Sequence, residues 1–171
     1  MKFLELAKAR YSCRNYKQVA VPPEKLDYIL ECARVAPSAA NFQPWHIIVI
    51  QDPQKKAEIA AVYPRDWFRD APALLILCGD HQASWKRQDG KDHCDIDISI
   101  ITDHITLAAA EQELATCWIC NFNAALCSEI LRLPDEIEPI VILTLGFPND
   151  TASARHENRK TMNEIIHRER F

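Results

Sequence analysis

Apolar and polar positions along the chain fall into two patterns. Apolar residues at helical spacing predict helices with one buried face at residues 23–36, which end before Pro37, and 94–115, which contain neither Pro nor Gly. Continuous apolar runs predict strands at residues 45–51, 72–78, 117–122 and 139–147. Shorter helices are expected at residues 3–9, at 53–63 and after the N-cap residue Asn123, whereas 64–71 and 79–92 are expected to be a turn and a polar loop. Strands that alternate with helices predict a three-layer domain of the α/β or α+β class.

Length and composition narrow the class of protein. With 171 residues, 48% of them hydrophobic and 26% charged, the chain fits one domain, 1–171, of an enzyme or binding protein. The net charge of -4 disfavours nucleic acid as a partner. No apolar stretch approaches the roughly 20 residues of a membrane span, and the first residues lack signal-peptide features. We therefore expect no membrane partner and a cytoplasmic location.

Seven cysteines are scattered along the chain, and with no secretion signal they are expected to be reduced thiols, mostly buried. Cys117 and Cys120 form a CxxC pair, which raises the alternative of a redox or zinc protein. Residues three apart on a strand point to opposite faces, and zinc needs two further ligands, for which His93 and Cys94 are the nearby candidates. We expect no metal site, and the thiol or zinc protein stays as an alternative.

Arg10, Ser12 and Arg14 place two guanidiniums and a hydroxyl close together, whether the stretch is helical or extended. An anion with several oxygens, such as phosphate, would use these donors and relieve the repulsion between the guanidiniums. Only three glycines are present, which excludes the P-loop and the dinucleotide fingerprint as the phosphate site. A solvated basic patch paired with carboxylates explains the same residues, so both interpretations stay open.

The loop at residues 37–46, PSAANFQPWH, joins a predicted helix to a predicted strand without a glycine. Ser38, Asn41 and Gln43 offer donors and acceptors to a flat ligand with a polar edge, and the two alanines let a ring approach closely. A helix C-cap followed by a turn accounts for the same residues without any ligand. The loop alone does not decide between these interpretations.

Four segments in this order resemble the nitroreductase family of FMN-dependent oxidoreductases, and the resemblance covers nearly the whole chain. They are Arg10-x-Ser12-x-Arg14 after a short first helix, APSAANFQPWHIIVI (36–50), LATCWICNF (114–122) and ENRKTMNEIIHRE (157–169). The chain departs from the family pattern before the third segment, where Glu111-Gln112-Glu113-Leu114 stands and members often have Gly.

The resemblance implies an α+β fold, a three-layer α-β-α sandwich with a mostly antiparallel mixed central sheet. It also implies an intertwined homodimer with FMN at the dimer interface, each site being lined by both chains. Residues 148–171 would then be a C-terminal extension that packs on the partner subunit.

Particular residues receive roles from the same resemblance. The phosphate and ribityl oxygens of FMN would be held by Arg10, Ser12, Arg14 and Arg159. The other subunit would contact the flavin ring through Pro37, Ser38, Ala39 and Asn41, with Gln43 either joining them or bracing the loop. Beside the ring would run Trp118, Ile119, Cys120 and Asn121, with a backbone N–H near Cys120 or Asn121 donating to the reactive flavin nitrogen.

The implied activity is the ping-pong reduction of nitroaromatic, quinone or related acceptors, with NAD(P)H as electron donor and FMN bound tightly without a covalent link. No catalytic side chain is implied, because the cofactor carries the chemistry and solvent can supply protons. Residues 79–92, with Trp67, Phe68 and Trp85, would supply the substrate lid. A non-catalytic FMN-binding or flavin-carrier protein on the same fold is the alternative.

Overall fold

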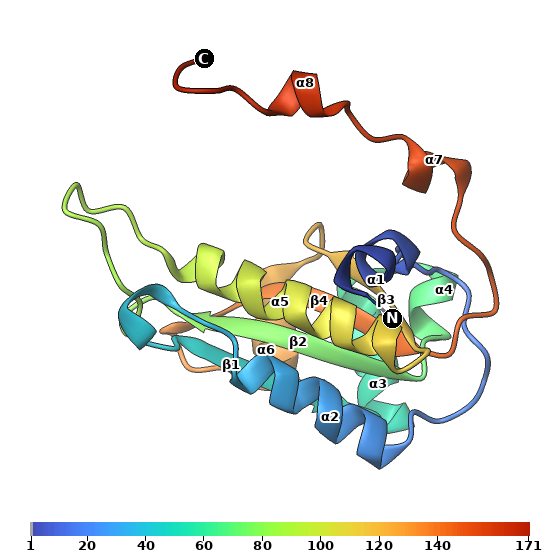
Figure 1. Cartoon of the computed structure of the whole chain (residues 1–171). Coiled ribbons are helices and arrows are strands. Elements are labelled where there is room, and N and C mark those ends of the chain that lie inside the picture. Colours follow the sequence, from blue (N-terminus) through green and yellow to red (C-terminus); the bar gives the residue numbers. More distant parts are fainter. Residues whose placement is uncertain (1) are drawn as a thin grey trace.

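A sheet with the strand order β1-β2-β4-β3 forms the centre of the molecule (Figure 1). The computed structural model describes residues 2–171. Its strands are β1 (Trp45–Ile50), β2 (Ala73–Asp80), β3 (Ala115–Ile119) and β4 (Ile137–Gly146), and each neighbouring pair is antiparallel. An isolated parallel bridge joins Ser12 to Thr116 beside β3. The prediction of a mostly antiparallel mixed sheet is therefore confirmed.

Helices cover both faces of this sheet, which gives the three layers expected from the sequence. They are α1 (Phe3–Ala9), α2 (Pro23–Arg34), α3 (Pro53–Ile59), α4 (Asp66–Arg69), α5 (Cys94–Glu111), α6 (Ala124–Leu131), α7 (Ala154–Glu157) and α8 (Met162–Ile165), with 3-10 turns η1 (Ala39–Asn41) and η2 (Ala60–Val62). α2 and α5 pack on one face, and α3, α4 and α6 pack on the other (Figure 1).

The central strand β2 shows why the sheet needs cover on both faces. Successive residues of a strand point to opposite sides. Leu75 and Leu77 therefore join the core beneath α2 and α5, whereas Leu74 and Ile76 join the core on the other face. All four side chains are at most 1% exposed. The continuous apolar run that predicted this strand is thus the consequence of burial on both sides.

Some predicted boundaries were wrong by a few residues. The helix predicted over 53–63 is α3 followed by η2, and the turn predicted over 64–71 contains α4. The strand predicted at 117–122 begins and ends earlier, at 115–119, because Ala115 and Thr116 already pair with Gly146 and Leu145 of β4. Alanine has a weak preference for strands, so the sequence alone did not place it in one.

The helix predicted over 94–115 ends at Glu111, because the chain turns at Glu113. Glu113 adopts a left-handed φ of 62°, and the N–H of Leu114 donates to the carbonyl of Ala109 at 2.8 Å. This is a helix end that glycine usually provides, and a residue with a Cβ pays roughly 1–2 kcal/mol for it. The position where family members often have Gly therefore keeps the glycine-like backbone.

The C-terminal tail begins in contact with the segment that follows α1. The N–H of Lys17 donates to the carbonyl of Phe147, and the N–H of Asn149 donates to the carbonyl of Asn15, each at 2.9 Å. After that point the tail passes α1, where His156 of α7 contacts the carbonyl of Lys8, and then carries α8 away from the body of the molecule (Figure 1). Its apolar side chains are half or more exposed, namely Met162, Ile165, Ile166 and Phe171. Across residues 2–171, no helix is both long enough and apolar enough to span a membrane.

Candidate functional site

Four of the residues predicted to hold an anion line one pocket of about 230 Å³: Arg10, Ser12, Arg14 and Arg159. They come from the segment after α1 and from the C-terminal tail, which are far apart in the sequence. Tyr11, Ser153, Arg155 and His156 complete the lining. Sequence reasoning did not assign Tyr11, Ser153, Arg155 or His156 to the site. The four-residue helix α7 ends at Glu157, so helical spacing gives no signal that would pair Arg155 with Arg159.

The segment that carries Arg10, Ser12 and Arg14 is fixed to the sheet by hydrogen bonds around its buried residues. The N–H of Cys13 donates to the carbonyl of Thr116 at 2.9 Å. The hydroxyl of Tyr16, which is 4% exposed, donates to the carbonyl of Cys13 at 2.9 Å and lies 2.6 Å from the Thr144 hydroxyl. Cys13 and Tyr16 therefore point inward, and Ser12 and Arg14, on either side of Cys13, line the pocket.

Asp150 holds the start of the tail against the same segment. Its carboxylate accepts the Tyr11 hydroxyl at 2.9 Å and the Arg14 backbone N–H at 3.3 Å, and it lies 3.1 Å from the Cys13 sulfur. Burial raises the pKa of the Cys13 thiol to about 11, so it stays protonated and can donate to this carboxylate. The carboxylate is thus occupied by groups other than the guanidiniums.

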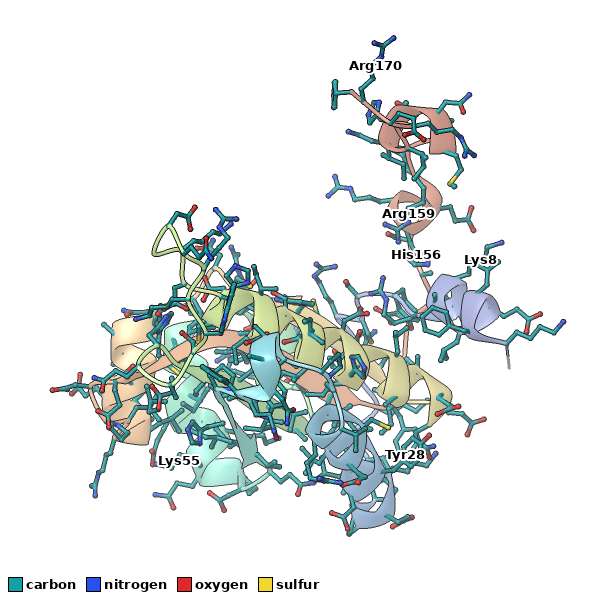
Figure 2. The ribbon with its side chains drawn as sticks, turned by 60° about the vertical axis from the view of Figure 1, so that its left-hand side comes forward. Lys8, Tyr28, Lys55, His156, Arg159 and Arg170 are labelled. Carbon is teal, nitrogen blue, oxygen red and sulfur yellow. The ribbon has the colours of Figure 1, made fainter. Side chains whose placement is uncertain are left out.

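His156 brings the later part of the tail back to α1. Its Nε2 lies 2.8 Å from the carbonyl of Lys8 and its Nδ1 lies 3.5 Å from a guanidinium nitrogen of Arg159. If Nε2 carries the proton and donates to Lys8, Nδ1 can accept from Arg159. Figure 2 shows His156 and Arg159 together on the tail beside Lys8. The contact with Lys8 thus brings this part of the tail to α1, where His156 and Arg159 both line the pocket.

The pocket is strongly cationic. None of the ion pairs within residues 2–171 involves Arg10, Arg14 or Arg159. The guanidinium of Arg14 instead lies over the ring of Trp67, 5.7 Å from its centroid. Guanidiniums that converge without a carboxylate suit an anion with several oxygens, so the geometry favours the anion site over a patch of paired surface charges.

A second cavity of about 220 Å³ adjoins this pocket and shares Arg10 and Ser12 with it. Asp103 and Thr106 of α5, with Thr116 and Trp118 of β3, form the rest of its lining. The indole N–H of Trp118 donates to the sulfur of Cys120 at 3.0 Å. Trp118 thus lines a cavity that adjoins the arginine pocket.

The residues after Trp118 differ in exposure. Ile119 is 5% exposed and its side chain packs in the core that contains α6, so only its backbone can face the cavity side. Cys120 and Asn121 lie beyond the end of β3 and are exposed.

The loop at 37–43 lies elsewhere on α5. The N–H of Ala39 donates to the carboxylate of Asp97 at 2.9 Å, and Asp97 is 1% exposed. Asp97 precedes Asp103 by six positions on the same helix, which is about 9 Å along the helix axis. None of the residues that line the two cavities belongs to this loop, so one chain does not bring Pro37, Ser38, Ala39, Asn41 and Gln43 to its own arginine pocket.

The backbone of this loop is strained. Ala40, Asn41 and Gln43 adopt left-handed φ angles of 50°, 58° and 52°, a region that glycine prefers. The Gln43 N–H donates to the Ser38 hydroxyl at 2.9 Å, and the Gln43 side-chain amide donates to the carbonyl of Asn41 at 3.2 Å. Gln43 therefore braces the loop. Strain that a structure maintains in this way is typical of functional sites.

The two cysteines of the CxxC pair differ in their surroundings. All seven cysteines are free thiols, with Cys117 buried and Cys120 exposed. Burial raises the pKa of the Cys117 thiol, although Arg14 and Arg10 lie near enough to oppose this. Neither cysteine belongs to the group of potential metal ligands that residues 2–171 contain.

The layers, the antiparallel sheet and the cationic pocket beside β3 define an α+β protein with a pocket of converging guanidiniums. The family model described as Nitroreductase family matches residues 7–63 and 60–147. These ranges span most of the chain, which therefore belongs to the nitroreductase family.

Known proteins agree with this assignment. The chain is similar to a nitroreductase family protein from Clostridium difficile 630, with a TM-score of 0.90 and 43% identity over 100% of both chains. It is similar to an FMN-dependent nitroreductase from Clostridium difficile R20291, with a TM-score of 0.83 and 25% identity over 99% of this chain and 100% of the other. It is 32% identical, over 91% of this chain and 82% of the relative, to a protein of Methanothermobacter thermautotrophicus with the provisional name NADH dehydrogenase/NAD(P)H nitroreductase.

Proposed function

We propose that this protein is an FMN-dependent oxidoreductase that uses NAD(P)H to reduce nitroaromatic, quinone or related acceptors by a ping-pong mechanism. The observation that carries the proposal is the pocket lined by Arg10, Ser12, Arg14 and Arg159, whose guanidiniums have no carboxylate partner within residues 2–171. The names of the relatives, which include an FMN-dependent nitroreductase and an NAD(P)H nitroreductase, support the cofactor and the electron donor.

The arginine pocket fits the phosphate of FMN in charge and in donors. A phosphate carries close to two negative charges at neutral pH and has three acceptor oxygens. Arg10, Arg14 and Arg159 offer planar donors that can bind such oxygens in pairs, and Ser12 adds a hydroxyl. The adjoining cavity, which shares Arg10 and Ser12, would take the ribityl chain and leads to Trp118. FMN, when bound, supplies the hydride acceptor and donor of the reaction.

The protein's own contribution is orientation. Trp118 and the backbone of residues 119–121 would lie along one side of the flavin ring, and a backbone N–H near Cys120 or Asn121 would donate to the reactive nitrogen. No side chain is proposed as an acid or base. Residues 79–92 would act as the substrate lid.

A homodimer accounts for the position of the loop at 37–43. Because this loop lies away from the arginine pocket of its own chain, we propose that Pro37, Ser38, Ala39 and Asn41 serve the site of the partner subunit. The exposed apolar residues of the tail, Met162, Ile165, Ile166 and Phe171, supply a surface for residues 148–171 to pack on that partner. We further propose that 1–171 is one domain, and that the protein works in the cytoplasm, where free thiols persist.

The absorption spectrum of the purified protein tests the cofactor. A flavin spectrum near one FMN per chain is expected, and colourless protein that takes up no added FMN would refute the proposal. Anaerobic titration with NADH and NADPH then tests catalysis, because bleaching of the flavin is expected. Bound FMN that neither donor reduces would indicate the alternative, a non-catalytic flavin carrier. Size-exclusion chromatography with light scattering tests the dimer, which a monomer that retains FMN would contradict.

A further inference from the structure

A second cluster of chemically active side chains lies at the other end of β2, outside the site described above. His81 follows β2, Asp92 ends the polar segment 81–92, and Cys94 begins α5. Each offers one ligand atom, and these atoms lie within 4.8 Å of one another. Within residues 2–171, no other group of at least three such side chains has this spacing.

The two ring nitrogens of His81 both face carboxylates. Nδ1 lies 3.1 Å from an oxygen of Asp92, and Nε2 lies 2.7 Å from an oxygen of Glu138. A neutral imidazole has one N–H and one lone pair. If Nε2–H donates to Glu138, the lone pair of Nδ1 points toward the negative charge of Asp92, which is unfavourable unless a cation lies between them. Either a second proton or a metal ion can supply that positive charge.

The other hydrogen bonds of the cluster are of the kind that hold metal ligands in position. Metal-binding histidines usually donate their other ring N–H to a carboxylate, and Glu138 provides it here. The other oxygen of Asp92 accepts the Ser84 hydroxyl and the Cys94 backbone N–H, each at 2.7 Å, so Asp92 is held with its second oxygen toward His81. Both features are present before any metal arrives.

Cys94 has space prepared for its sulfur. Its side chain is buried, and a Cβ at Gly79 would collide with that sulfur. Gly79 is one of the three glycines in the chain. The sulfur has a contact of 4.0 Å with the carbonyl of Pro44, which is too long for a strong hydrogen bond. The thiol therefore lacks a good partner of its own.

The cluster is open to solvent on a side of the molecule that carries negative charge. The side chains of His81 and Asp92 are 37% and 32% exposed. A surface pocket of about 480 Å³, lined in part by His81, Asp135, Glu136 and Glu138, opens beside them. Acidic lining attracts cations, and the opening provides an entry path.

We propose that His81, Asp92 and Cys94 bind a zinc ion, with a water molecule in the fourth position. Nitrogen, oxygen and sulfur ligands together suit Zn²⁺, whose tetrahedral bonds are about 2.0–2.3 Å long. The His81 nitrogen and the Asp92 oxygen, which lie 3.1 Å apart, already have about the separation of two ligands of such an ion. Binding would release the protons of the Cys94 thiol and of any charged imidazole. The ion would join both ends of the segment 81–92 to α5, and so would fix the base of that segment. The site is independent of the proposed FMN chemistry.

Metal titration of the tag-free protein, stripped with a chelator, tests this proposal. One Zn²⁺ per chain is expected, and Co²⁺ as a probe should give the near-ultraviolet absorption of a cobalt–thiolate bond. Cys94→Ser should remove that absorption and weaken Zn²⁺ binding by more than about 100-fold, and Glu138→Ala should weaken it by about 10- to 100-fold, the usual effect of losing a support to a ligand. Zn²⁺ should raise the Tm of the wild-type protein but not of Cys94→Ser.

Matched controls separate ligand loss from damage to the fold. Cys127→Ser changes an equally buried thiol on the other face of the sheet, and His104→Gln changes a histidine in the middle of α5. Both should keep the Zn²⁺ affinity within about twofold. If Cys94→Ser does not fold, His81→Gln and Asp92→Asn alter partly exposed ligands and should each weaken binding. The proposal is wrong if no stoichiometric Zn²⁺ binds, or if binding survives these changes or is lost equally in the folded controls.

Discussion

Tyr16 offers a sharp test of how the arginine-bearing segment is held. Its hydroxyl is buried between the carbonyl of Cys13, at 2.9 Å, and the hydroxyl of Thr144, at 2.6 Å. Burial raises the pKa of Tyr16, so its hydroxyl remains a proton donor across the working pH range. Tyr16→Phe keeps the ring and removes both hydrogen bonds, leaving the Cys13 carbonyl without this donor.

The expected loss follows from the burial of those partners. Leaving a buried polar group without its partner costs about 1–3 kcal/mol. For a chain of this size each kcal/mol lowers Tm by about 2–4 °C, so the expected fall is about 2–12 °C. Urea unfolding followed by circular dichroism, at one protein concentration, should show a lower midpoint with an unchanged slope.

Tyr28→Phe is the matched control. The Tyr28 hydroxyl donates to the Glu111 carboxylate at 2.6 Å on the surface of α2 (Figure 2), so its loss should change stability by no more than about 0.5 kcal/mol. Combining Tyr16→Phe with Thr144→Val should reveal a coupling of about 0.5–3 kcal/mol, because the two hydroxyls contact each other. Equal losses for the two tyrosines, or no coupling, would refute the role given to Tyr16.

Three further predictions address the site. Arg14→Ala should weaken FMN binding, measured by fluorescence titration, by about 10- to 150-fold, the effect of losing about 1.5–3 kcal/mol. Arg34→Ala, which removes an exposed guanidinium of α2 paired with the Glu31 carboxylate, should leave FMN binding within twofold. Equal effects would mean that Arg14 is ordinary surface charge. In flavin-free protein at neutral pH, iodoacetamide should modify exposed Cys120 before Cys78, because burial raises the pKa of the Cys78 thiol to about 12. Added FMN should slow the reaction at Cys120. Peptide mapping that finds Cys78 modified first would contradict the structure. Asp97→Ala removes the acceptor of the Ala39 N–H, so hydrogen exchange across residues 37–43 should become faster. The free energy of unfolding should fall by about 1–3 kcal/mol. Unchanged exchange would show that the loop does not depend on this contact.

Part of the candidate site could be predicted from the sequence. Arg10, Ser12 and Arg14 are close together in the chain, so their common location needs no tertiary knowledge. Arg159 was added through the family resemblance, and the structure places it in the same pocket. Arg155 and His156 were missed, since a charged stretch in a tail has the same appearance whether it is solvated or folded back.

The loop at 37–43 shows a different limit. Its composition suited both a ligand site and a simple helix end. Only the backbone angles of Ala40, Asn41 and Gln43 show that it is strained, and only its contact with Asp97 shows that it lies away from the arginine pocket of its own chain. Neither property can be obtained from residue types. The backbone angles depend on how the folded loop makes its own hydrogen bonds, and the position of the loop depends on a helix that follows more than 50 residues later.

The sequence by itself determined the four strands, the longer helices and the layers that they form. Burial on both faces makes strands such as β2 continuously apolar, and burial on one face gives helices such as α5 their spacing. Tertiary structure alone decided where the elements end and which distant residues meet. The turn at Glu113, the return of His156 to Lys8 and the meeting of His81 with Asp92 and Cys94 each depend on contacts between separate segments. Local propensity does not depend on such contacts, so they can be identified only in the folded chain.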